Sequence, residues 1–247
     1  MRRIIGRDGA RGRGIGRPAG ILILGAALFV TACSSQHGRS LPPLGSAVAP
    51  APATAAPFTD SAALQAKLLG VADMPPGFDQ LDDGGGNGPT PQDRSHTDPA
   101  ACARVLDAVS SQVAGASASG AVHYSSPDFD SIDIDAASYP NGAAAQAFST
   151  TERLVRQCTA YAGTDADGTA VTYRIGGLDQ PRAGDSSMSF QLQTSSQGLT
   201  LYSAATLALV GSTVVQIARA GQKPVPPPAL SALTATQVQR LQGIAGP

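Results

Sequence analysis

Apolar and polar residues alternate along six segments of the chain, the pattern of β-strands with one buried face. Between residues 129 and 138, for example, Ile132 is followed by Asp133 and the alternation then repeats. The six segments are residues 121–126, 129–138, 171–175, 188–192, 199–210 and 213–219. A Gly-Ser pair at 211–212 predicts a tight hairpin between the last two segments, so we expect neighbouring strands to run antiparallel.

Apolar residues at steps of three and four mark two longer helices. Asp98 followed by Pro99 predicts the start of the first, with Asp98 as its N-cap. Its apolar stripe consists of Cys102, Val105, Leu106, Val109 and Val113. The second helix, expected over residues 141–161, places Phe148 and Cys158 on one buried face. Shorter helices are predicted over residues 61–69 and 230–244.

These elements together predict an α+β fold, in which helices pack on one face of an antiparallel sheet of about six strands. From Cys33 onward, Leu, Ile, Val and Phe supply only 40 of 215 residues, and the 247-residue chain has no Trp, so we expect a thin, Ala-rich core. The folded body is expected over residues 58–222. A Pro-rich segment and the last helix follow over residues 223–247, and the sequence leaves open whether that helix docks on the body.

The first 33 residues predict export and a lipid anchor. Six Arg side chains precede residue 18, and residues 21–30 form an apolar run shorter than the roughly 20 residues that a membrane span needs. The Val-Thr-Ala-Cys sequence that follows resembles a bacterial lipobox, whose Cys is acylated and becomes the new N-terminus. We therefore expect a signal peptide over residues 1–32 and a lipid such as palmitate on Cys33. An ordinary cleaved signal, or a twin-arginine signal, is the alternative.

Residues 33–57 predict a flexible tether, because they hold five Pro residues among Ser, Gly and Ala. The signal peptide and lipid place the body on the extracytoplasmic face of the cell membrane, and such a tether lifts it away from the membrane surface. Beyond residue 32, 11 basic side chains face 17 acidic ones, a net charge of −6. This balance argues against a nucleic acid as partner, because binding to phosphates needs basic side chains.

The chain has three Cys residues, of which the lipid takes one. The other two, Cys102 and Cys158, both lie on apolar helical stripes, and an exported protein meets an oxidising compartment. We therefore expect a Cys102–Cys158 disulfide, with two buried free thiols as the alternative. A catalytic role for either Cys does not fit these positions.

Few side chains in the sequence suggest catalysis or metal binding. Four carboxylates crowd one strand region: Asp128, Asp130, Asp133 and Asp135. They could hold a hard cation, but the alternation predicts that Asp133 and Asp135 face water opposite Ile132 and Ile134. His96 and His123 are expected at the surface, and no G-x-S-x-G motif accompanies them. We therefore expect neither an enzyme, nor a metal, nor a cofactor.

The order of the elements resembles a known family. A lipobox and tether precede a short helix ending in LLGVADMPPGF, a Cys-bearing helix, a strand pair, a YPNGAAAQAF…LVRQC helix and a strand meander. Over residues 61–221 this order is similar to the extracellular sensor domain of actinobacterial proteins, found in the mycobacterial receptor kinase PknH and in free-standing lipoproteins. The resemblance implies a sensor-like domain that binds an unidentified envelope ligand and has no enzymatic activity.

The sequence therefore predicts a lipid-anchored domain that binds a small molecule, a lipid or a protein. A carrier of lipid or another apolar envelope molecule is the first alternative, and an envelope hydrolase is the second. A binding cleft is expected where the Cys158 helix crosses the strands, with Tyr161 and Tyr173 nearby. Tyr202 is a further candidate for such a cleft.

Overall fold

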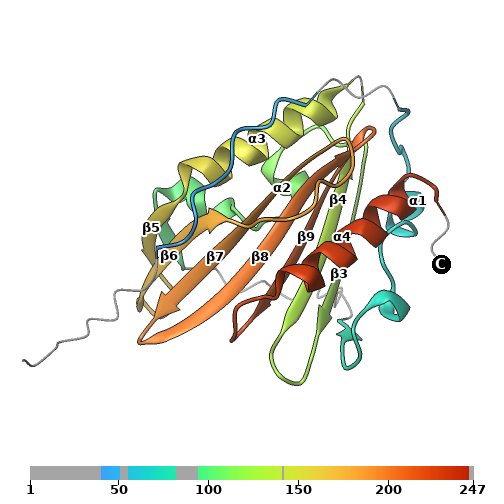
Figure 1. The fold of residues 1–247 in the computed structure, drawn as a ribbon. Coiled ribbons are helices and arrows are strands. Elements are labelled where there is room, and N and C mark those ends of the chain that lie inside the picture. The colour runs from blue at the N-terminus through green and yellow to red at the C-terminus, as the bar shows by residue number, and fades with distance from the viewer. Residues whose placement is uncertain (1–39, 51–54, 82–93, 141, 245–247) are drawn as a thin grey trace, which may run out of the picture. The chain divides into compact units, whose positions relative to one another are not determined.

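Nine antiparallel strands form one sheet through the centre of the protein (Figure 1). The computed structural model describes residues 40–50, 55–81, 94–140 and 142–244, all within the unit Ser40–Pro247. The strand order is β1-β3-β4-β9-β8-β7-β6-β5-β2. Six strands correspond to the predicted segments: β3 (Ala118–Ser125), β4 (Ser131–Ser138), β6 (Ala170–Gly177), β7 (Ser186–Ser196), β8 (Leu199–Val210) and β9 (Thr213–Gly221). The predicted α+β class is confirmed.

The predicted strand number was wrong, because three short strands lie at the two edges of the sheet. These are β1 (Asp79–Gln80), β2 (His96–Asp98) and β5 (Ala160–Thr164). A strand of two or three residues is too short to show alternation. In β5 no residue is fully buried, so its sequence carries no apolar face either. The β8–β9 hairpin has Gly211 at φ 58°, the positive φ that a tight hairpin turn requires at its first central position.

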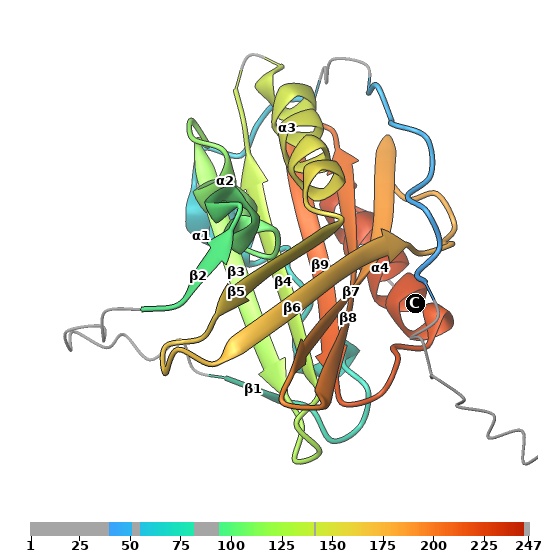
Figure 2. The same ribbon diagram turned by 90° about the vertical axis from the view of Figure 1, so that its left-hand side faces the viewer.

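Helices cover both faces of the sheet, not one face as expected (Figures 1 and 2). On one face lie α3 (Ala143–Gln157), α2 (Val109–Gln112) and the 3₁₀-helix Ala100–Arg104. The opposite face carries α1 (Ser61–Gln65) and α4 (Pro227–Leu241). The alternation of β9 requires this arrangement, because Val214 packs toward α3 while Val215 packs toward α4. Central strands that are apolar on both faces need a cover on each.

The C-terminal helix docks firmly on the body, which the sequence had left open. Leu230, Leu233 and Val238 of α4 are buried against the sheet. The buried amide of Gln237 accepts a hydrogen bond from Leu69 N–H and donates one to the Lys67 carbonyl, both at 3.0 Å. Since Gln237 is fully buried, these two bonds fix α4 against the end of the α1 region.

The helix predicted from Asp98 is broken into two short pieces. Asp98 is not an N-cap but pairs with Ala162 as the last residue of β2. The chain then forms the 3₁₀-helix Ala100–Arg104 and, after a gap, α2. Arg104 stabilises the break by donating to the carbonyls of Ser111 and Gln112, at 2.5 and 2.8 Å. The predicted stripe is nevertheless buried at Cys102, Val105 and Val109.

Among the described residues, no helix is long and apolar enough to cross a membrane.

Candidate functional site

Residues 40–50, which we call the N-terminal strap, lie extended along α3 and reach the end of β6 (Figure 1). Three hydrogen bonds hold the strap: Gly177 N–H to the Pro42 carbonyl (2.8 Å), Arg156 Nη1 to the Gly45 carbonyl (2.8 Å) and Val48 N–H to Glu152 Oε1 (3.0 Å). Leu44 and Val48 also pack against the core under α3. This part of the expected flexible tether is therefore bound to the body. Cys33 and the predicted signal peptide lie outside the described residues.

Two consecutive glycines at the end of β6 make room for the strap. A Cβ on Gly176 would overlap Leu41 and the Pro42 carbonyl, and one on Gly177 would overlap the Pro43 carbonyl. Glycine weakens a strand interior, and one reason to find it there is the close approach of another backbone. Here the approaching backbone is the strap.

We expect Gly177→Ala to loosen the strap without unfolding the body. The added methyl group would displace Pro43 and break the neighbouring hydrogen bond to Pro42. Amide hydrogen exchange should then be about tenfold faster at Val48, which corresponds to about 1.4 kcal/mol of lost protection. Gly45→Ala is the matched control, because a Cβ at Gly45 meets nothing within 4 Å. Equal exchange at Val48 in both variants would contradict the docking role of the glycines.

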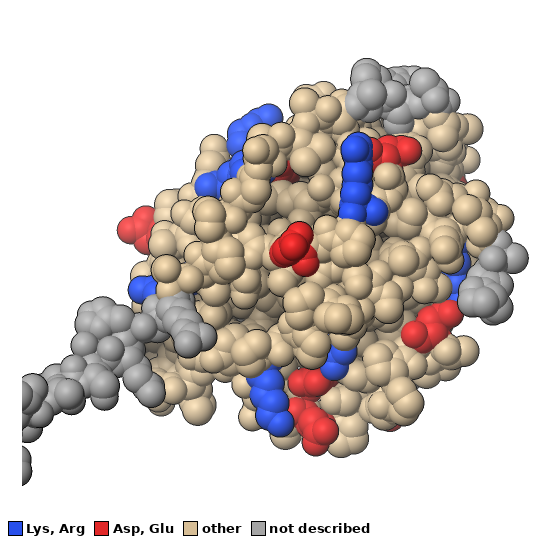
Figure 3. Space-filling model, viewed as in Figure 1, with Lys and Arg blue, Asp and Glu red and all other residues tan. Residues whose placement is uncertain are grey.

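The strap forms one wall of a groove on the surface of the body. Its cavity of about 480 Å³ lies between the strap, the start of β7 and the start of α4. A second cavity of about 440 Å³ adjoins it and shares Val48, Leu178 and Ser189. The apolar part of the lining comes from Pro42, Pro43, Val48, Leu178, Met188 and Pro227. On the face seen in Figure 3, charged side chains are few and scattered.

The charge of Arg156, in the groove wall, is compensated. Its Nε and Nη2 donate to Glu152 Oε1 at 3.0 and 2.8 Å. Only 5% of the Glu152 side chain and 26% of the Arg156 side chain are exposed. The same carboxylate accepts the strap's Val48 N–H, so the ion pair holds the strap and leaves little net charge for a ligand. Asp179 at the rim is exposed and makes no ion pair with the described residues.

Gln180 lines the second cavity, and one of its side-chain atoms has no hydrogen-bond partner among the described residues. Its Nε2 donates to the Pro227 carbonyl at 2.9 Å, while its buried Oε1 accepts no hydrogen bond from the described residues. A buried polar atom without a partner is costly unless a ligand or an ordered water satisfies it. The first cavity therefore combines largely apolar walls with a neutralised ion pair. The second cavity adds the polar side chains of Asp179, Gln180 and Arg182.

The predicted disulfide is confirmed. Cys102 of the 3₁₀-helix Ala100–Arg104 and Cys158 at the end of α3 are bonded, with 5.6 Å between their Cα atoms. Both residues are at most 2% exposed. The bond joins the two helical segments that cover one face of the sheet.

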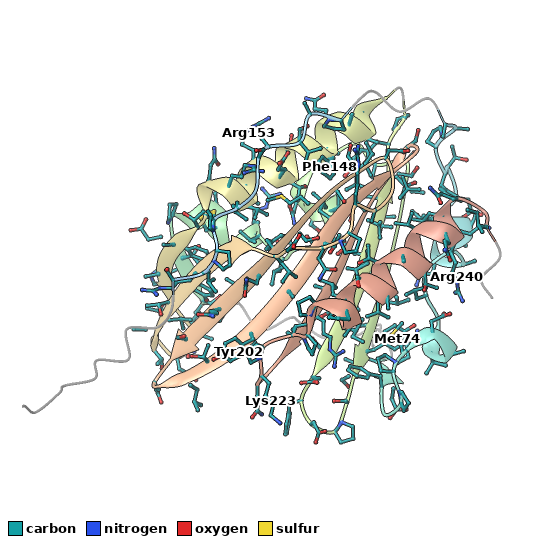
Figure 4. All side chains as sticks on the ribbon, viewed as in Figure 1. Met74, Phe148, Arg153, Tyr202, Lys223 and Arg240 are labelled. Carbon is teal, nitrogen blue, oxygen red and sulfur yellow. A yellow bond between two sulfur atoms is a disulfide. The ribbon has the colours of Figure 1, made fainter. Side chains whose placement is uncertain are left out.

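Tyr161 and Tyr173 lie opposite each other in the β5–β6 pair. Their rings stack with centroids 4.5 Å apart and planes at 8°. Burial, with a smaller contribution from Tyr173, raises the pKa of Tyr161 to about 12, so its hydroxyl is neutral at pH 7. The structure brings these two predicted ligand-binding residues together, but other residues line the groove. Their role in binding stays a prediction, and Tyr202 lies apart near the lower edge in Figure 4.

The four predicted carboxylates do not converge on a cation site. Asp133 pairs with His123 at 2.8 Å and Asp130 with Arg219 at 3.4 Å. Within the described ranges, no three His, Cys, Asp or Glu side chains gather as metal ligands.

Asp135 was expected to face water, and this was wrong. It is only 8% exposed because α2 and the loop before it cover this part of β4. Its Oδ1 accepts from Val109 N–H at 2.6 Å, and Gln216 Nε2 lies 3.4 Å from its Oδ2. Burial raises the pKa of Asp135 to about 7, although these hydrogen bonds and the nearby His123 partly oppose the shift. The charge of Asp133 adds a small increase.

The two globular His residues lie on different strands. His96 Nδ1 is 2.9 Å from Thr164 Oγ1 at the exposed β2–β5 edge, and His123 contacts Asp133. Ser212 stands in the β8–β9 turn and donates to the Ala55 carbonyl. Among the described residues, no His contacts this serine, so the structure adds no support for the hydrolase alternative.

An α+β fold with one large antiparallel sheet defines the class of this protein. No family model matches the chain, and no curated protein matches it.

The solved structures that resemble it include two mycobacterial proteins. One is the extracellular domain of PknH from Mycobacterium tuberculosis, with a TM-score of 0.54, 11% identity, and coverage of 77% of this chain and 98% of that chain. The other is an uncharacterised Rv0999 ortholog from Mycobacterium smegmatis, with a TM-score of 0.37, 12% identity, and coverage of 69% and 92%. The resemblance to the PknH extracellular domain is thus confirmed as a similarity of fold.

Proposed function

We propose that this protein is a non-catalytic, sensor-like domain of the cell envelope that binds a ligand in the groove beside the N-terminal strap. The observation that carries the proposal is the groove itself, in which the strap, β7 and α4 enclose a cavity of about 480 Å³ with largely apolar walls. The fold shared with the PknH extracellular domain supports a domain of this kind.

The ligand we propose is uncharged and partly apolar. Pro42, Leu178 and Met188 offer apolar contacts, and the adjoining cavity offers hydrogen bonds from the polar side chains of Ser187 and Ser189. Arg156 is already neutralised by Glu152, so a free phosphate or carboxylate gains little there. A cavity of this size suits a small molecule or one end of a longer chain.

The location follows from the first residues. A lipid on Cys33 holds the protein at the extracytoplasmic face of the membrane, and the signal peptide of residues 1–32 directs it there. The lipobox sequence supports this anchor.

A lipid carrier finds less support than a binding domain. A carrier needs a large apolar cavity between helix and sheet. The layer beneath α3 is packed instead with Phe148, Val155, Phe190 and Leu207, each at most 1% exposed. Phe148 lies under α3 in Figure 4.

Native mass spectrometry of the full chain, purified from its own membranes in mild detergent, tests the binding site. We expect an added mass on the wild-type protein that Ser46→Trp removes, because Ser46 lines the groove and an indole would fill it. Gln157→Trp is the control, since Gln157 is exposed on the last turn of α3 and does not line either cavity. An added mass lost from both variants, or kept by both, would place the ligand elsewhere. Wild-type spectra with no mass beyond the acylated chain would contradict binding.

A further inference from the structure

Large apolar side chains are exposed at the tips of two hairpins. Phe129 stands in the β3–β4 turn with 80% of its surface exposed and a φ of 63°. Positive φ is uncommon for a bulky residue and strains its backbone, so an aromatic ring at this position calls for a reason. Packing in the folded protein supplies no such reason, because the exposed ring of Phe129 contributes little to the core.

The β7–β8 hairpin presents a similar tip. Leu199 is 78% exposed and Leu201 is 41% exposed. Being two residues apart in β8, these side chains point to the same side of the sheet. Neither belongs to the two buried cores.

Both tips lie at the same end of the sheet. Ser131, which closes the β3–β4 hairpin, pairs with Ala220, and Ala220 pairs with Ser203. Leu201 and Leu199 continue β8 beyond Ser203, in the direction in which the β3–β4 turn projects. Figures 1 and 2 both show the two hairpins pointing to the lower end of the body.

Residues typical of a membrane interface lie at the same end. Tyr202 and Lys223 are both found along this lower edge in Figure 4, and Tyr202 pairs with Gly221 across β8 and β9. Tyr is enriched where headgroups meet hydrocarbon, and Lys can lie along an apolar surface while its ammonium reaches the headgroups. Asp128 beside Phe129 is exposed, so its charge limits the depth of the tip to the headgroup region.

We propose that this end of the body docks on the lipid bilayer through Phe129, Leu199 and Leu201. The proposal rests on the lipid anchor of the proposed function. Seven residue steps separate Cys33 from Ser40, where the strap begins, and they span at most about 25 Å. A body held so closely to the bilayer must turn one side toward it, and shallow insertion of apolar tips fixes which side.

Single Trp reporters test this orientation, because the chain contains no Trp. Phe129→Trp and Leu199→Trp are made in the full-length lipidated protein and reconstituted into phosphatidylcholine vesicles with brominated acyl chains. Bromine quenches Trp within the bilayer, so we expect each emission to fall at least twofold and to shift to the blue. Gln146→Trp is the control: Gln146 is exposed near the start of α3, and α3 follows the end of β4 opposite the β3–β4 turn. Its emission should not change.

The outcomes separate the docking from the anchor. Vesicles that carry the protein while neither tip is quenched overturn the docking and leave the anchor standing; the tips would then be candidates for a protein partner. Equal quenching of all three reporters also overturns it, because the body would have no fixed orientation. If the wild-type protein does not float with vesicles, and the Cys33→Ala variant behaves identically, the protein lacks the lipid anchor. The proposed anchor and the proposed docking then both fail.

Discussion

Replacing both Cys102 and Cys158 by Ala should lower the free energy of unfolding by about 4 kcal/mol. The bond closes a loop with a sequence separation of 56 residues, and releasing that loop restores the entropy of the unfolded chain. The core under α3 would then have to hold the 3₁₀-helix Ala100–Arg104 in place by packing alone. Both Cys residues are buried, and Ala is a small apolar residue that leaves no free thiol at either position.

Urea unfolding followed by circular dichroism measures this effect. The wild-type protein in excess dithiothreitol should unfold at nearly the same midpoint as the double variant, since both lack the bond. If the free energies of unfolding of the double variant and of the reduced protein lie within about 1 kcal/mol of the oxidised wild type, packing alone holds these helical segments.

Asp135→Asn should stabilise the protein at pH 8 by roughly 4 kcal/mol and have little effect at pH 4. Burial raises the pKa of Asp135 from its ordinary 3.8 to about 7. Between these values the folded protein binds a proton that the unfolded chain has lost, so stability falls as pH rises, by about 1.4 kcal/mol per pH unit. Above about pH 7, Asp135 is ionised in the folded protein as well, so its effect on stability no longer changes with pH. Asn does not titrate, and its Oδ1 still accepts from Val109 N–H.

Urea midpoints of wild type and variant at pH 4, 5, 6, 7 and 8 give this difference directly, because all other groups are common to both. Asp133→Asn is the matched control, as it removes the same charge from the same strand at a side chain that is 43% exposed. Its effect should stay below about 1 kcal/mol. A constant difference between wild type and Asp135→Asn across this range would show that Asp135 is ionised throughout.

Local pattern was enough to predict the long elements of the fold. Alternation places β4 and β8 correctly, and helical spacing places α3 and the burial of Cys158. Local pattern fails at the short edge strands β1, β2 and β5, because they show no alternation of apolar and polar residues. It also fails at Asp135, because water or a covering helix can each lie above the polar face of a strand. Only the position of α2, set by contacts far along the chain, decides between them.

The groove could not have been predicted from the sequence. Its walls come from the strap, β7 and α4, which meet only after folding. The composition of residues 40–50 is that of a disordered linker, and nothing in these residues indicates docking. The one local signal is the Gly176-Gly177 pair in an otherwise regular strand, which predicts a close backbone approach but not which segment approaches.

If Cys33 carries the proposed lipid, docking of the strap raises the effective concentration of the body beside that anchor. For a lipid on Cys33, a free tether to residue 57 would have 24 residues and a root-mean-square reach of about 27 Å, whereas seven residues reach about 15 Å. The volume that the body samples shrinks by the cube of this ratio, about sixfold. With that anchor, a partner embedded in the same patch of membrane would be met at about six times the local concentration, without a single new contact.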